Sequence, residues 1–125
     1  MDLQGFELRE GYACFRPWGP ITPEAYPELL KKAMLACQEH QVTRLLVDVR
    51  LLTHRPITDI DRFHIADTLA AFWDRRIKLA TVGRTDQIGP ERFGILVAKN
   101  RGLYAWDCTS ESEALNLLLG RSPGV

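Results

Sequence analysis

The chain has 125 residues, enough for one domain with a substantial core. Its sixteen basic and sixteen acidic residues cancel, which excludes a general electrostatic surface for nucleic acid or for an anionic membrane. The hydrophobic fraction of 46% is that of a globular protein, and no apolar run approaches the ~20 residues that span a bilayer. The first residues also lack the features of a signal peptide. We therefore expect one cytoplasmic domain over residues 1–125, with its core at about 5–120 and a loose tail at 121–125, that neither binds nucleic acid nor inserts stably into a membrane.

The first predicted element is a β-hairpin. Residues Phe6–Arg9 alternate apolar and polar side chains, as a half-buried strand does. Glu10 and Gly11 supply a tight turn, and Tyr12–Arg16 returns as the second strand. The hairpin predicts an antiparallel pair of strands in the sheet.

A helix is predicted next, from a cap at Thr22 to about His40. Pro23 would occupy the first helical position, where its missing N–H costs nothing. Apolar side chains recur at helical spacing and form one face. That face consists of Tyr26, Leu29, Leu30, Ala33, Met34 and Cys37. A buried strand, Arg44–Val49, follows this helix.

A second helix is predicted to begin at Thr58 or Asp59. Its apolar stripe consists of Ile60, Phe63, Ala66, Leu69, Ala70 and Trp73. Two further apolar side chains, Ile65 and Phe72, lie off this stripe, so apolar residues nearly encircle the helix. Either the sheet and a neighbouring helix cover these two side chains, or they belong to a surface for a partner or a second copy of the chain.

The remaining elements continue the alternation of strand and helix. Ile77–Val82 is predicted as a strand, and Leu103–Trp106 as the last strand. Between them a third helix is expected to begin at Gly89 and Pro90 and to stop at Gly102. Its inward residues would be Phe93, Leu96 and Val97. The final helix opens with the capping pair Ser110 and Glu113, buries Ala114, Leu115, Leu118 and Leu119, and ends at Gly120.

Strands separated by helices require crossover connections, which are right-handed and build a mostly parallel sheet. The opening hairpin adds an antiparallel pair. We therefore predict an α/β fold, a single mixed five-stranded sheet with an opening β-hairpin and about four helices.

Several segments of the chain carry a family resemblance. They are ITPEAYPELL, RLLVDVR, RIKLATVG and YAWDCTSESEALNLL, and with the hairpin they extend from Phe6 to Leu119. In these segments and in the order of its elements the chain resembles the SpoIIAA-like (STAS/SEC14) group of STAS-like domains, which are small bacterial proteins. The resemblance implies a STAS-like fold and a non-enzymatic domain that regulates, binds a protein partner or binds a small ligand.

The resemblance also implies where a regulatory site would lie. STAS antagonists of anti-sigma factors carry a phosphorylatable serine just before the helix that follows the third strand. The matching segment here, LLTHRPITDID, has no serine, and its only hydroxyls are Thr53 and Thr58. A phosphate on Thr58 would meet the positive end of the helix dipole. The alternative is that Thr58 is simply the helix cap, with Asp61 as its acidic partner three residues later.

The junction from Arg44 to Asp61, between a buried strand and a helix, is a common place for working residues in α/β domains. It contains neither a phosphate-binding loop nor a nucleophile elbow. Its candidates for partner binding are Asp48, His54, Asp59 and Asp61. Asp61 and His64 share a helix face, but no spacing fixes a third ligand, so we predict no metal and no cofactor.

Two other places in the chain carry residue types that can bind ligands or react. The loop from Arg84 to Arg92 combines two arginines with two glycines, Gly83 and Gly89, and is a candidate anion-binding site. The three cysteines, Cys14, Cys37 and Cys108, match no zinc or redox spacing and are predicted to be buried reduced thiols. Cys108 has no histidine near it in sequence, which argues against a nucleophile.

The residues and the resemblance together leave three hypotheses. The first is a non-enzymatic regulatory or protein-interaction domain that binds a protein partner or itself as a homodimer. The second is a carrier of a small apolar or anionic ligand, held between the second and third helices. The third is an enzyme that uses Asp48, His54 or Cys108, and the absence of a catalytic motif makes it the weakest.

Overall fold

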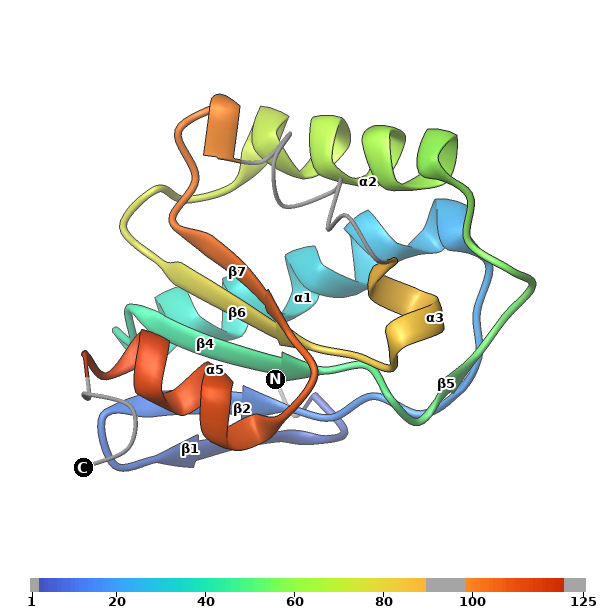
Figure 1. The fold of residues 1–125 in the computed structure, drawn as a ribbon. Coiled ribbons are helices and arrows are strands. Elements are labelled where there is room, and N and C mark those ends of the chain that lie inside the picture. Colours follow the sequence, from blue (N-terminus) through green and yellow to red (C-terminus); the bar gives the residue numbers. More distant parts are fainter. Residues whose placement is uncertain (1–2, 90–98, 121–125) are drawn as a thin grey trace.

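The computed structural model describes residues 3–89 and 99–120, and its α/β fold contains the predicted mixed five-stranded sheet (Figure 1). The strands in spatial order are β1 (Phe6–Arg9), β2 (Tyr12–Phe15), β4 (Arg44–Asp48), β6 (Lys78–Val82) and β7 (Ala105–Cys108). β1 and β2 form the predicted antiparallel hairpin, and every other neighbouring pair in this sheet is parallel. The predicted fold class is therefore confirmed.

Helices cover both faces of the sheet. They are η1 (Pro23–Ala25), α1 (Tyr26–Glu39), α2 (Asp59–Phe72), the short α3 (Thr85–Ile88) and α5 (Glu111–Leu118). Each parallel strand lies beside the previous one, so right-handed crossovers place α1 and α2 on the same side. Figure 1 shows these two helices behind and above the sheet and α5 in front of it. None of the described helices has the length and the apolar character needed to cross a bilayer.

Alternation along the strands creates two separate cores. On the side of α1 and α2, Phe15, Leu45, Val47 and Leu79 pack with the apolar faces of the two helices. On the side of α5 the core consists of Cys14, Leu46, Ala80, Val82, Cys108, Ala114 and Leu118. All three cysteines are buried thiols that form no disulfide with one another, as predicted.

A second, two-stranded sheet was not predicted. β3 (Gly19–Pro20) pairs in parallel with β5 (Leu52–Thr53), and the amide of Ile21 donates to the carbonyl of Thr53 at 2.9 Å. This pairing ties the loop after β4 to the segment before η1. It thereby fixes where the chain enters α2.

Three predicted details of the helices were wrong. Residues Pro23–Ala25 form a 3-10 turn whose Thr22 makes no side-chain cap, and α1 begins only at Tyr26. On α2, Ile60 is 70% exposed and Phe63 is 37% exposed, because the helix turns Ala66, Leu69 and Ala70 toward the core. The segment expected to be a loop contains α3, which Gly89 ends with a φ of 81°.

The last strand was placed two residues too early. Pairing with β6, from Leu79 opposite Ala105 to Val82 opposite Cys108, defines β7 as Ala105–Cys108. The predicted stop at Gly102 has a φ of 83° and follows helical residues Lys99 and Asn100. Several predictions fall outside the described residues. They concern the inward residues of the third helix (Phe93, Leu96 and Val97), the candidate Arg92 and the tail at 121–125.

Candidate functional site

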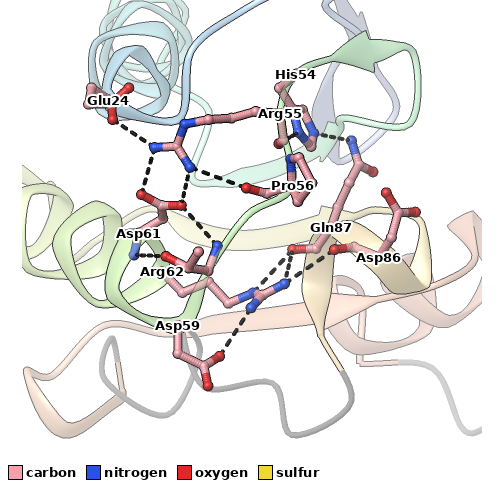
Figure 2. A network of polar contacts seen from close by, with 10 residues as sticks. Glu24, His54, Arg55, Pro56, Asp59, Asp61, Arg62, Asp86 and Gln87 are labelled. Carbon is pink, nitrogen blue, oxygen red and sulfur yellow. Dashed lines mark hydrogen bonds and ion pairs between the residues drawn. The ribbon is translucent and has the colours of Figure 1, made fainter.

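The start of α2 is held by an arginine from the preceding loop (Figure 2). The guanidinium of Arg55 binds both carboxylate oxygens of Asp61, at 2.7 and 2.9 Å, and Glu24 of η1 at 2.8 Å. Thr58 and Asp61 form the predicted capping box, since each accepts a hydrogen bond from the other's backbone amide. The cap role of Thr58 is therefore confirmed. Its phosphorylation stays a prediction, as does that of Thr53, which is exposed in β5.

We expect Asp61 to make the stability of the fold sensitive to acid. Hydrogen bonds from Arg55 and from the Thr58 amide hold the pKa of Asp61 well below its ordinary value. Its stabilising effect is therefore complete above the unfolded pKa of about 3.9 and is lost as the pH falls below it. In urea unfolding, wild type and Asp61→Asn should differ in midpoint at pH 7, and the gap should narrow toward pH 2. A gap that stays constant over this range would contradict the prediction.

A buried amide connects α3 to the loop after β4. Gln87, only 6% exposed, donates from Nε2 to the carbonyl of Val49 at 2.8 Å and approaches Nε2 of His54 at 3.2 Å. Its Oε1 accepts from the amide of Arg84 at 2.8 Å. An amide nitrogen only donates, so Nε2 of His54 accepts and its Nδ1 carries the proton, which it donates to the carbonyl of Arg55 at 2.7 Å.

Arg62 connects α2 to α3. Its Nε and Nη2 donate to the carbonyl of Gln87, both at 3.3 Å, and Nη2 also donates to that of Asp86 at 3.2 Å (Figure 2). Its Nη1 pairs with Asp59 at 3.1 Å. The guanidinium lies over Gly89, where an added Cβ would come within 2.9 Å of the Arg62 Cζ. The side chain of Arg62 thus links α2 to α3 and packs against Gly89.

Beneath this contact lies a cavity of about 120 Å³ between α1, α2 and the sheet. Its apolar lining includes Leu30 of α1, Ile65, Ala66 and Leu69 of α2, and Leu79 and Ala105 of the sheet. The polar described residues at its edge are Tyr26, Arg62, Thr81, Gln87 and Asp107. An apolar cavity with a few polar groups is the usual form of a small-molecule site.

Tyr26 is the distinctive polar residue of this cavity. The side chain is 6% exposed, and its ring packs edge-on against the ring of His54 with centroids 6.0 Å apart. In the described part of the chain its buried hydroxyl has no hydrogen-bond partner. Burial raises the pKa of Tyr26 to about 12, so the hydroxyl keeps its proton at neutral pH. It is therefore a buried donor and acceptor without a partner among the described residues.

The structure separates Asp48 from the other candidates of the junction. Asp48 points toward the α5 side, where its carboxylate accepts from Nε of Arg50 at 2.9 Å and from Nη2 at 2.8 Å, and lies 3.5 Å from Nε of Arg16. Burial alone would raise the pKa of Asp48, but the hydrogen bonds from Arg50 hold it below its ordinary value. His54, Asp59 and Asp61, by contrast, come together around α2 and α3.

The other predicted residues have structural contacts. Arg84 donates to the carbonyls of Arg50 and Leu52 and pairs with Asp86. Ile65 and Phe72 are partly buried against the first core, so neighbouring elements cover much of both side chains. Burial raises the pKa of Cys14, and it raises that of Cys37 to about 12, so both are poor nucleophiles. In residues 3–89 and 99–120 no three His, Cys, Asp or Glu side chains converge as a metal site requires.

Fold and cavity together define an α/β domain with an apolar cavity between two helices and one face of its sheet. No protein-family model matches the chain, and neither a curated protein nor a solved structure matches it. The STAS-like resemblance therefore stays a prediction.

Proposed function

We propose that this domain binds a small molecule in the cavity between α1, α2 and the sheet, and acts as its carrier or sensor without catalysis. The observation that carries the proposal is the buried hydroxyl of Tyr26, unpartnered within the described residues, beside an apolar cavity. A buried hydroxyl without a partner is unfavourable, and a ligand can supply the missing hydrogen bond. The SEC14-like side of the resemblance agrees with a carried ligand.

The polar groups at the cavity support binding more than catalysis. Gln87 and Arg62 donate hydrogen bonds to backbone carbonyls, and Arg62 also pairs with Asp59. These contacts hold the helices in position. Tyr26 is protonated at neutral pH, so it does not supply a base. Among the described residues the arrangement offers an apolar cavity beside the unpartnered hydroxyl of Tyr26.

Native mass spectrometry of gently purified protein tests the proposal. We expect an added mass on the wild-type chain, and we expect Ala66→Leu, which fills the cavity from α2, to abolish it. Ala71→Leu is the matched control, because Ala71 is an exposed residue of the same helix and does not line the cavity. Wild-type protein without added mass in repeated preparations would contradict a carrier.

A second candidate is self-association or binding of a protein partner, as in the regulatory hypothesis. It is favoured by the exposed apolar side chains of Ile60 and Phe63, one helical turn apart on α2. Light scattering should then report a dimer that Ile60→Ser converts to a monomer. A wild-type monomer at all concentrations tested would count against self-association.

A further inference from the structure

The charges around the cavity do not favour an ionic ligand. Arg62 lines the cavity, but its guanidinium donates to the carbonyls of Asp86 and Gln87 and pairs with Asp59. A carboxylate ligand would compete with all three of these contacts. It would also face Asp107, which lies beside Thr81 in the register of β6 and β7 and lines the same cavity. A cationic ligand would lie close to the positive charge of Arg62. A ligand of either charge therefore meets a side chain of like charge in this cavity.

The volume limits the size of the ligand. Apolar cavities of about 150 Å³ in proteins stay dry and take up benzene. The cavity here, at about 120 Å³, has a mostly apolar lining. It therefore suits a single ring or an aliphatic chain of about six carbons, which is smaller than a fatty acid or a phospholipid.

The hydroxyl of Tyr26 adds one polar requirement. A water bound to it would need two to four polar partners to be stable, and it would leave the apolar side chains of Leu30, Ala66 and Leu69 without contacts. A ligand that carries one hydrogen-bonding group satisfies Tyr26 and fills the apolar space at the same time. A hydrocarbon of equal size would leave this hydroxyl unpaired.

We infer that the ligand is a neutral, phenol-sized molecule, such as a phenol, a cyclic alcohol or a ketone, whose single oxygen hydrogen-bonds to Tyr26. This inference rests on the proposed function, because it assigns the chemical class of the molecule that the same cavity holds. An anionic ligand, one of the alternatives that the sequence leaves open, is disfavoured at this cavity by Asp107 and by the contacts that Arg62 already makes.

Titration calorimetry with three probes of equal ring size tests the inference. The probes are phenol, toluene and benzoate, added to the full chain. We expect phenol to bind about tenfold more tightly than toluene, since one hydrogen bond is worth roughly that factor, and benzoate to bind more weakly than both. The affinity of Tyr26→Phe for phenol should fall to its affinity for toluene, and its affinity for toluene should equal that of the wild type. Tyr104→Phe, at an exposed tyrosine, is the matched control and should leave all three affinities unchanged.

Failure of the inference can be told apart from failure of the proposed function. If toluene binds as tightly as phenol and Ala66→Leu abolishes both, the cavity binds ligands but the polar requirement is wrong. If benzoate binds best, the neutral class is wrong. If no probe binds while native mass spectrometry shows an adduct that Ala66→Leu removes, the size class is wrong and the proposed function stands. If neither a probe nor an adduct is bound, both fall.

Discussion

Replacing Gln87 with leucine is expected to remove about 2–6 kcal/mol from the free energy of unfolding. Leucine is similar in size but leaves the buried carbonyl of Val49 and the amide of Arg84 without their partner. Each unsatisfied backbone group of this kind costs about 1–3 kcal/mol. Because the whole domain has about 5–15 kcal/mol to lose, the variant should be severely weakened. Urea unfolding would show this as a lower midpoint with an unchanged slope.

Gln38→Leu is the matched control for this substitution. Gln38 is exposed on α1, and its side chain makes one hydrogen bond, at 3.1 Å, to Asp74. We expect this second variant to lose less than about 1 kcal/mol, as surface substitutions usually do. Equal losses in the two variants would show that the amide of Gln87 does not hold α3 to the loop.

Replacing Gly89 with alanine is expected to cost about 2–4 kcal/mol. The residue has a φ of 81° and a ψ of 153°, a conformation that essentially only glycine adopts, so a side chain there costs about 1–3 kcal/mol. The new Cβ would also lie 2.9 Å from Cζ of Arg62, so the guanidinium must move away from the carbonyls of Asp86 and Gln87. Hydrogen bonds from a charged group contribute at most about 1.5–3 kcal/mol each to stability. Part of this stabilisation is recovered when the displaced guanidinium forms hydrogen bonds with water.

Gly102→Ala separates these two effects. Gly102 has nearly the same φ, 83°, and none of the described atoms lies within 4 Å of its added Cβ. The Gly102→Ala variant should therefore lose only the free energy that the backbone conformation costs, about 1–2 kcal/mol. In an Arg62→Ala background the difference in stability between the two alanine variants should become smaller. If they differ as much there as in the wild type, the contact between Arg62 and Gly89 is not the cause.

The elements marked by local signals could be predicted from the sequence. The turn at Glu10 and Gly11 gave the hairpin, and the cap at Thr58 gave the start of α2 within one residue. The orientation of α2 could not be predicted, because apolar residues lie nearly all around it and contact with α1 and the sheet decides which ones are buried. Likewise, Leu103 and Ala105 are both buried and two residues apart, so alternation alone did not fix the ends of β7.

The candidate site was predictable only where its contacts are local. Asp61 lies three residues after Thr58, and the spacing predicts their pairing. Gln87 meets His54 and Val49 across more than thirty residues of chain, and nothing in the TDQI segment signals that contact. The sequence places Tyr26 in an apolar helix face, and the one signal of its role is that a buried tyrosine needs a partner for its hydroxyl. The cavity depends on how three elements are spaced, which no residue pattern records.

The order of the strands has a consequence for how the chain acquires its fold. From β2 onward each parallel strand docks beside the one made just before it, so the sheet can grow strand by strand during synthesis. Among the described helices, only α5 covers the face that carries Cys14, Leu46, Ala80 and Val82. Until that helix leaves the ribosome and docks, the nascent sheet presents an apolar face to the cell. The eight residues of α5 therefore determine how long the growing chain needs protection from aggregation.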